Sequence, residues 1–370
     1  MRRNLTTTTT AITEEISFLS NSDSYCVCFI DMIDSTKIIA QIAIPDKVRR
    51  YYSIFLNSMS ALIKKFGGSI IKNLGDSLVF YFPKTCDSAN RSAFKDVIEC
   101  GITMMAAFKV INSKMSQMQL PNVNYRISAD YGSSVIAKSA NSQAYDLYGP
   151  TMNICAKINS KAPPNGMVIG NDLYEILSSF SSPSFFDDYS FKRTGEYLVD
   201  GLKQPYLLHS VVSKYENENI TIQQQQRLEK SQLPQEQYQK PQQQESIQKN
   251  ILLVDDEPDI ILTYKSILIE EGYNVNAYTD SREALRHFAQ LDPLYYKLIL
   301  LDIRMSNLNG FQLYYRLKAI SPNIRVLFVS ALDAAQEMVS ILPDVKLDDI
   351  VRKPIDNEQF LRKVKMTLSA

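Results

Sequence analysis

The chain has 370 residues, and its 40 basic residues balance its 40 acidic residues, so the formal net charge is zero. That balance gives no electrostatic reason to expect a nucleic acid or an anionic membrane as a partner. No apolar stretch approaches the roughly 20 residues of a membrane-spanning helix. The N-terminus lacks the apolar core of a secretory signal, so we expect a cytoplasmic protein.

The length predicts two domains, each large enough to bury a core of its own. The five cysteines fit neither a disulfide framework nor zinc-ligand spacing, and we expect them to pack as small apolar residues. The chain has only two histidines, which disfavours histidine-based nucleophilic catalysis and a histidine-rich metal site.

The first predicted domain covers residues 24–212 and follows a lead-in, residues 1–23, that we expect to be poorly ordered. The end of the lead-in, residues 13–19, allows a short helix. The elements predicted within the domain are, in chain order, a strand over 25–31, a helix over 45–66, two strands within 69–82, a helix over 88–115 and a strand over 124–131. Asp31 ends the first strand and Asp76 stands in the turn between the next two, so both acids are expected at the tips of neighbouring strands.

Two carboxylates at adjacent strand tips suit two divalent cations that hold a triphosphate. A hydroxyl-rich turn with free backbone amides follows Asp31 and adds phosphate-binding donors. Its residues are Ile33, Asp34, Ser35 and Thr36. Two cations can promote an in-line displacement at phosphorus without a strong protein base, so the pattern indicates metal-assisted phosphoryl chemistry.

Two further segments complete a family pattern. They are Lys72-Asn-Leu-Gly-Asp76 and Tyr145-Asp146-Leu-Tyr-Gly-Pro-Thr-Met-Asn153-Ile-Cys-Ala-Lys157. With them, residues 24–212 resemble a class III nucleotide cyclase catalytic domain. The resemblance implies a ferredoxin-like βαβ core with a mixed sheet, paired head to tail in a homodimer whose active sites are shared between the two copies.

The resemblance also implies roles for individual residues. Asp31 and Asp76 of one copy would bind Mg²⁺ or Mn²⁺, while Lys72 and Asp146 of the other copy would contact the base. Asn153 would orient the ribose, and Arg126 aligns with a basic position that contacts phosphate in some members.

The base-reading pair favours ATP over GTP. An ammonium donates to adenine N1 and a carboxylate accepts from the N6 amine, whereas guanine presents the reverse pattern at those edges. The expected products are 3′,5′-cyclic AMP and pyrophosphate.

Two positions depart from the cyclase pattern. Lys157 stands where the family has a transition-state arginine, and lysine keeps the charge but loses the planar fork that engages phosphate oxygens in pairs. Asp200 stands where the family has a triphosphate-binding lysine, although Lys203 lies close by. The alternative interpretation is therefore a catalytically impaired domain that binds nucleotide or dimerises as a scaffold.

Residues 213–249 are rich in glutamine and carry too little apolar surface to offset the entropy of ordering, so they are predicted to be a linker. A helix over residues 220–232 is left open.

The second predicted domain, residues 250–370, has four apolar runs that end in polar groups. The groups at the four ends are Asp255 and Asp256, then Asp302, then Ser330, and last Lys353. In an open parallel sheet these ends converge on one crevice. The acids suit Mg²⁺, Asp302 is placed as a nucleophile toward a phosphoryl group, and Lys353 and Ser330 would hold the phosphoryl oxygens.

This segment resembles the receiver domain of response regulators, a flavodoxin-like (βα)₅ fold with a parallel sheet. The predicted helices cover residues 258–271, 281–290, 309–320, 333–341 and 356–368. The resemblance implies that Asp302 accepts phosphate from a sensor histidine kinase. Ser306 and Ile350 depart from the family pattern, the second at a position where many receivers carry a switching aromatic residue.

Together the segments predict a signalling protein in which phosphorylation of Asp302 changes the output of the cyclase domain through dimer geometry. A third interpretation, a phosphorelay intermediate that passes phosphate from Asp302 to a histidine protein, is neither supported nor excluded by the sequence.

Overall fold

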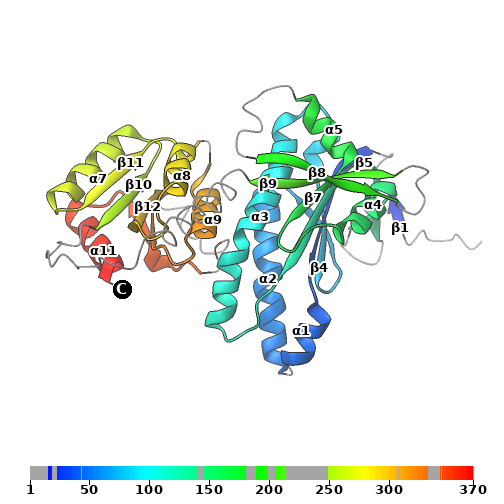
Figure 1. Cartoon of the computed structure of the whole chain (residues 1–370), viewed down its shortest axis with the longest axis horizontal. Coiled ribbons are helices and arrows are strands. Elements are labelled where there is room, and N and C mark those ends of the chain that lie inside the picture. The colour runs from blue at the N-terminus through cyan, green and yellow to red at the C-terminus, as the bar shows by residue number, and fades with distance from the viewer. Residues whose placement is uncertain are drawn as a thin grey trace, which may run out of the picture.

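A computed structural model describes residues 16–18, 23–42, 44–139, 145–180, 189–198, 205–213, 249–306, 308–331, 342 and 344–369, which form two lobes (Figure 1). Most of the predicted linker and the predicted helix at 333–341 lie outside the described residues. The domain boundaries stay predictions. In the part of the chain that is described, no helix is long and apolar enough to cross a membrane.

The N-terminal lobe is built on a mixed sheet. Its strands are β1 (Ile16–Phe18), β2 (Asp23–Met32), β3 (Ser69–Asn73), β4 (Ser77–Phe82), β5 (Tyr125–Ser139), β6 (Tyr145–Tyr148), β7 (Met167–Gly170), β8 (Tyr189–Tyr197) and β9 (Tyr206–Ser213). The main path runs β3-β4-β2-β5-β7-β9-β8, and β1 and β6 also pair with β5. Within that path only β5 and β7 are parallel. The predicted mixed sheet is confirmed, whereas the short helix allowed near residues 13–19 is wrong because Ile16–Phe18 is a strand.

Helices cover both faces of this sheet. They are α1 (Ser35–Ile42), α2 (Pro45–Lys65), α3 (Arg91–Gln117), α4 (Pro150–Asn159) and α5 (Asn171–Ser179), with a 3₁₀ turn, η1, at Pro83–Cys86. Proline at its first position starts α2, and Gly67, with φ +79°, follows its end because glycine tolerates that left-handed conformation. The two long predicted helices are confirmed, whereas α1 lies where the sequence indicated only a turn.

Alternation along β2 assigns its residues to the two faces. Cys28 and Ile30 pack in the cluster that contains the residues of α2 and α3, while Val27 and Phe29 pack with Cys155 of α4. Asp31 continues the second series, so it lies on the face that carries α4. Four of the five cysteines are buried free thiols, as expected of small packing residues, whereas Cys86 is exposed, so the expectation is wrong for that residue.

The C-terminal lobe is a five-stranded parallel sheet with the order β11-β10-β12-β13-β14. The strands are β10 (Asn250–Val254), β11 (Asn274–Tyr278), β12 (Tyr296–Asp302), β13 (Val326–Ala331) and β14 (Ile350–Lys353). The helices are α7 (Pro258–Glu270), α8 (Ser281–Ala289), α9 (Gly310–Ile320) and α11 (Asn357–Ser369), with a 3₁₀ turn, η3, at Leu347–Asp349. The flavodoxin-like fold and these four predicted helices are confirmed.

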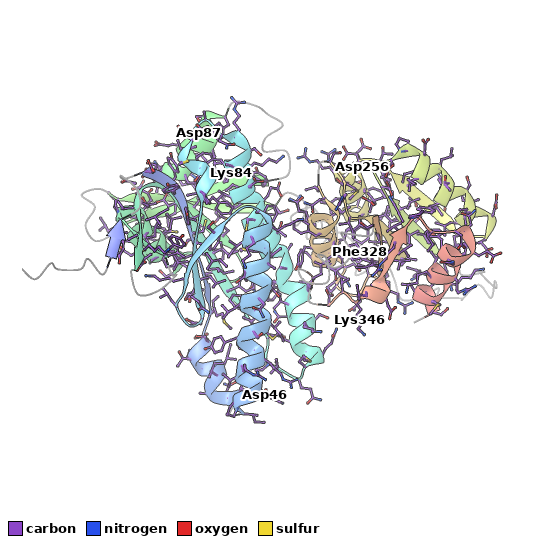
Figure 2. The ribbon with its side chains drawn as sticks, turned by 180° about the vertical axis from the view of Figure 1, so that it is seen from behind. Asp46, Lys84, Asp87, Asp256, Phe328 and Lys346 are labelled. Atoms are coloured by element: carbon purple, nitrogen blue, oxygen red, sulfur yellow. The ribbon has the colours of Figure 1, made fainter. Side chains whose placement is uncertain are left out.

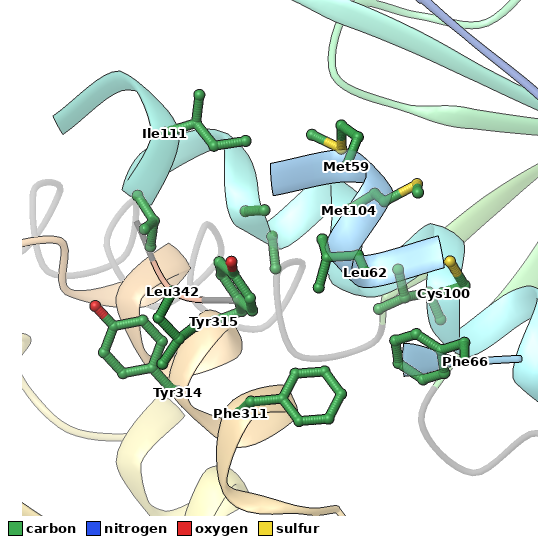
Figure 3. Close-up of a cluster of buried hydrophobic side chains, with 14 of the residues drawn as sticks. Met59, Leu62, Phe66, Cys100, Met104, Ile111, Phe311, Tyr314, Tyr315 and Leu342 are labelled. Atoms are coloured by element: carbon green, nitrogen blue, oxygen red, sulfur yellow. The ribbon is translucent and has the colours of Figure 1, made fainter. Parts of the chain in front are cut away.

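The two lobes contact one another through α9, which packs against α3 (Figures 1 and 2). The side chains of α9 are buried from Gly310 to Leu317 because one side of the helix covers the parallel sheet and the other meets the N-terminal lobe. Figure 3 shows Tyr315 turned toward α2 and α3, whereas Tyr314 faces away from them. Tyr314 packs instead against Phe328 of β13, with ring centroids 5.3 Å apart. The sequence did not predict this contact.

Candidate functional sites

Asp31 and Asp76 converge on one hydroxyl. The Ser77 Oγ donates to Asp31 Oδ1 at 2.5 Å and lies 3.3 Å from Asp76 Oδ1. Register brings them together, because Asp31 on β2 pairs with Ser77, the first residue of β4. Ser35 of α1 donates to the other oxygen of Asp76. The two predicted strand-tip acids are therefore neighbours, as a shared cation site requires.

The surroundings of Asp31 disfavour its charged form. Burial raises the pKa of Asp31 and the nearby Asp76 charge adds to the rise, while the Ser77 hydrogen bond and the Arg126 charge oppose it. Arg126 lies opposite Asp31 in the β2–β5 register. Its Nε is buried and has no hydrogen-bond partner among the described residues. A cation beside the carboxylates and an anion beside Arg126 would each relieve an unfavourable interaction.

The turn after Asp31 differs from the expectation of free amides. The Ile33 amide donates to the carbonyl oxygen of Asn124 at 2.7 Å, so the prediction that it is free is wrong. Asp34 has φ +54°, a left-handed conformation that aspartate tolerates better than most residues, and its exposed carboxylate pairs with Lys37 at 2.9 Å. Ser35 and Thr36 begin α1, where helix geometry leaves the first amides unpaired within the helix.

Lys72 and Asp146 form a partly exposed ion pair, with Nζ 2.7 Å from Oδ1. Lys72 lies on β3 and Asp146 on β6, elements that the sequence places far apart. Burial alone would raise the pKa of Asp146, but hydrogen bonds from Lys72 and from the Leu147 amide lower it overall. A donor and an acceptor thus stand side by side within one copy of the chain.

Asn153 and Lys157 are exposed and lie four residues apart on α4, so they share one helix face. The helix is held by Asn159, a buried side chain that the sequence did not single out. Its Nδ2 lies 3.4 Å from the carbonyl oxygen of Phe29 and 3.3 Å from that of Arg126. Ser77 was also missed, because neither residue type carries a sequence signal for such a contact. Asp200 and Lys203 lie outside the described residues.

The N-terminal acids fit a divalent cation. Hard carboxylate oxygens suit Mg²⁺ or Mn²⁺, and each oxygen has a second lone pair beyond the one that meets a serine hydroxyl. Two adjacent negative charges, one of them partly buried, supply the field that such a cation would neutralise.

The second site lies at the carboxyl ends of the parallel strands. Lys353 Nζ lies 2.7 Å from Asp255 Oδ2 and 3.0 Å from Asp302 Oδ1, and both carboxylates are buried. Burial raises the pKa of Asp302 to about 6, against the opposing effect of Lys353. Burial also raises the pKa of Asp255. The predicted lysine and two of the predicted acids are thus in direct contact.

The other predicted members line the same strand ends. Asp256 Oδ2 accepts from the Ser306 amide at 3.0 Å. The Ser330 hydroxyl is buried and has no hydrogen-bond partner among the described residues. Among those residues, no three acids, histidines or cysteines are grouped as a ready metal site, and Lys353 lies between Asp255 and Asp302. The carboxylates still fit a hard cation, since each oxygen can accept more than one contact.

Two family models match the chain. One describes the adenylate and guanylate cyclase catalytic domain and matches residues 19–213, more than half of the chain. The other describes the response regulator receiver domain and matches residues 251–365. The chain therefore belongs to the adenylate and guanylate cyclase family and carries a receiver domain, which makes it a signalling protein and confirms the predicted fusion.

Curated relatives match over a shorter stretch. Regulatory protein VanRB of Enterococcus faecalis is 32% identical over 118 residues, which are 32% of this chain and 51% of that protein. Transcriptional regulatory protein TrcR of Mycobacterium tuberculosis is 29% identical over 115 residues, which are 31% of this chain and 43% of that protein. The chain thus spans about half the length, or less, of these relatives.

Among solved structures, the adenylyl cyclase CyaB from P. aeruginosa is 18% identical, with a TM-score of 0.47 over 52% of this chain and 96% of that one. The guanylyl cyclase Cya2 is also 18% identical, with a TM-score of 0.46 over 52% of this chain and 95% of that one.

Proposed function

We propose that the N-terminal domain converts ATP to 3′,5′-cyclic AMP and pyrophosphate, and that phosphorylation of Asp302 controls the rate. The observation that carries the catalytic part is the contact of one hydroxyl, that of Ser77, with both Asp31 and Asp76. The contact supports the proposal because it brings the two carboxylates close enough to share divalent cations, in a chain that belongs to a cyclase family.

Each residue of the site has a task that its position supports. Bound divalent cations supply a lowered pKa at the attacking ribose hydroxyl and charge neutralisation at the leaving oxygen. Asp31 and Asp76 hold those cations, and Arg126, with its unpartnered Nε, binds phosphate oxygens. The turn of Ile33 to Thr36 borders the triphosphate through its remaining amides, and the Lys37 ion pair offsets the charge of Asp34.

The remaining contacts come from Lys72, Asp146, Asn153 and Lys157. The paired Lys72 and Asp146 present a donor and an acceptor to adenine N1 and N6. Asn153 orients the ribose, and Lys157 lies one helical turn further on the same face, where it meets the developing charge on phosphorus. We assign the two groups of residues to different copies of the chain, so that a homodimer forms the complete site.

At the second site, Asp302 attacks the phosphoryl group that a sensor histidine kinase donates. Lys353 contacts Asp302 and would neutralise the incoming phosphoryl oxygens, while the unpartnered Ser330 hydroxyl gains an acceptor. Asp255 and Asp256 hold a divalent cation such as Mg²⁺ beside Asp302.

The catalytic proposal is tested by incubating the purified full chain with ATP or GTP, in Mg²⁺ or Mn²⁺, and quantifying cyclic products. Formation of cyclic AMP at a rate above that of cyclic GTP is expected. Asp31→Asn should abolish the product while keeping the size of the side chain. Cyclic GTP as the main product would overturn the assignment of ATP.

The second candidate is a nucleotide-binding or dimerising scaffold, which the lysine at position 157 favours because it lacks the planar fork with which arginine engages two phosphate oxygens in parallel. The substitution Lys157→Arg distinguishes an active cyclase from a scaffold. In an active cyclase the forked side chain should raise kcat by about 10-fold or more. A nucleotide-binding scaffold would bind ATP, measured by calorimetry, and neither kind of scaffold would form a cyclic product with either residue.

A further inference from the structure

A buried charge pair joins the two lobes. Arg316 of α9 donates from Nη2 to Glu99 Oε2 of α3 at 2.5 Å, and the two side chains are 5% and 4% exposed. Gln312, one turn earlier on α9, reaches the same oxygen at 3.4 Å. Around the pair, Phe311 packs edge-on against Phe66 at the end of α2, with ring centroids 5.7 Å apart. The contact between the lobes thus combines a buried ion pair with apolar packing.

This pair is incompletely satisfied. Glu99 Oε1 and the Nε and Nη1 atoms of Arg316 are buried without a hydrogen-bond partner among the described residues. A half-satisfied buried network adds little stability of its own, but removing one partner leaves an uncompensated charge. A small change in the position of α9 therefore changes the energy of the whole contact.

The start of α9 touches the phosphorylation site. The Gly310 amide donates to the carbonyl oxygen of Ile303 at 2.9 Å. A Cβ atom at Gly310 would lie 2.3 Å from the carbonyl oxygen of Asp302, so only glycine fits there. Asn309 caps the helix together with Gln312. A shift of the backbone at Asp302 would therefore displace the first turn of α9. That turn also contains Gln312, whose side chain contacts Glu99.

On the other side of the contact, α3 touches the strands of the N-terminal site. The Tyr125 hydroxyl donates to the carbonyl oxygen of Met104, five residues after Glu99 on α3, at 2.5 Å. Tyr125 pairs with Met32 across β2 and β5, next to the pairing of Asp31 with Arg126. Gly101 of α3 would meet Met167 of β7 at once if it carried a Cβ atom. The helix is therefore packed directly against β7 and against β5, the strand that pairs with β2 beside Asp31.

We propose that α9 is the element through which the receiver acts on the cyclase domain, with Glu99 of α3 as its docking partner. Phosphorylation at Asp302 moves the first turn of α9 and changes how tightly Arg316 and Gln312 hold Glu99. The inference rests on the proposed phosphorylation of Asp302. It does not depend on which nucleotide the cyclase domain uses.

Hydrogen–deuterium exchange of the full chain, with and without acetyl phosphate and Mg²⁺, tests the coupling. Mass spectrometry of the intact protein first establishes that Asp302 is phosphorylated, with Asp302→Asn as the unmodified control. We expect the exchange of amides in both α9 and α3 to change by roughly fivefold or more in the phosphorylated chain and not in the control.

The outcomes separate the inference from the function on which it rests. No phosphorylation would overturn both. Phosphorylation with a changed α9 and an unchanged α3 would overturn the inference alone and leave the receiver assignment standing. Neither readout requires cyclase activity, so an inactive cyclase domain would still test the coupling.

Charge-pair variants test the partner. Arg316→Met and Glu99→Met should each lower Tm by roughly 5–10 °C, because each leaves one buried charge unpaired, while the double variant should recover most of the loss. Phosphorylation should no longer change α3 exchange in the single variants that fold. Arg362→Met and Glu358→Met, at exposed positions of α11, are the matched controls. Additive losses in the double variant, or unchanged coupling in the single variants, would contradict the role of Glu99.

Discussion

At the scale of single residues, Ser77 organises the N-terminal acids. Its hydroxyl has one hydrogen, which the closer carboxylate, that of Asp31, accepts at 2.5 Å. The contact fixes the orientation of Asp31 before any cation binds, and Ser35 does the same for Asp76. A side chain that orients metal-binding carboxylates affects affinity without touching the metal.

Ser77→Ala should therefore weaken the binding of Mn²⁺ by about tenfold, because Asp31 loses the group that holds its rotamer. The measurement is a titration of free Mn²⁺ by electron paramagnetic resonance. Ser116→Ala, at an exposed position of α3, serves as the control. Unchanged affinity in Ser77→Ala would show that the hydroxyl has no orienting role.

Asp130 is a second residue with an unusual environment. Burial raises its pKa to about 7, although the Tyr206 hydroxyl and the amides of Tyr131 and Leu173 donate to its carboxylate. Gly170 makes room for it, since a Cβ atom there would lie 2.4 Å from the carboxyl group. The group ties β5 to the start of α5.

This environment predicts a pH-dependent stability. The folded-state pKa of Asp130 lies above that of the unfolded chain, near 4, so between these values only the unfolded chain is ionised. Its contribution to the free energy of unfolding is therefore complete below pH 4 and is lost as pH rises to about 7. In the wild-type protein, the free energy of unfolding should fall by about 2 kcal/mol from this group between pH 5 and 7, and Asp130→Asn should abolish that fall. Thermal unfolding across this range measures it, and parallel pH profiles of the two proteins would contradict the assignment.

At the scale of elements, α4 shows how a helix can position exposed side chains through one buried anchor. Asn159 holds the end of the helix against β2 and β5, while Asn153 and Lys157 face outward. The anchor and the exposed residues thus have separable roles.

Asn159→Ala should lower both stability and cyclase activity, because it removes the buried hydrogen bonds from α4 to β2 and β5 and frees α4 to shift. We expect a loss of roughly 1–3 kcal/mol, measured by thermal unfolding. Asn153→Ala is the matched control and should lower activity while leaving Tm unchanged. Loss of activity without loss of stability in Asn159→Ala would indicate a direct role in binding.

The elements also show what the sequence can predict. Period-two and helical apolar patterns located the main strands and long helices, because each pattern reports local burial on one face. Helix α1 was missed because it is short and follows a turn. The contact between Lys72 and Asp146 and the roles of Ser77 and Asn159 depend on strand register and tertiary packing, which no local pattern encodes.

The docking of α9 was missed for a related reason. The residues Phe311, Tyr314 and Tyr315 have the composition of any buried receiver helix, and nothing local indicates that two of its sides are covered. The burial of Arg316, which the structure shows, is what reveals the second covered side, because a buried arginine requires a partner.

At the scale of the whole molecule, the receiver docks on the helices of one sheet face, while Asp31, Arg126 and α4 belong to the other. The alternation of β2 and β5 residues fixes this separation. The face with the acids is thus not covered by the docked receiver, as pairing with a second copy requires.

Pairing predicts complementation between inactive variants. If Asp31 and Lys72 act from different copies, Asp31→Ala and Lys72→Ala should each be inactive, and an equal mixture should regain about a quarter of the wild-type activity. Half of the randomly formed dimers would be mixed, and each would hold one intact site of two. Mixing Asp31→Ala with Asp76→Ala should restore nothing. Equal recovery in both mixtures would contradict the shared site.

The Arg316–Glu99 contact has a consequence for how this chain can be recombined. A foreign receiver grafted onto this cyclase would bring its own third helix, and without an arginine and a phenylalanine in register it would leave Glu99 stranded under an ill-fitting surface. Functional chimeras should therefore keep the docking residues of α9 when the receiver is exchanged. The contact between the domains depends on these side chains and not on the linker alone.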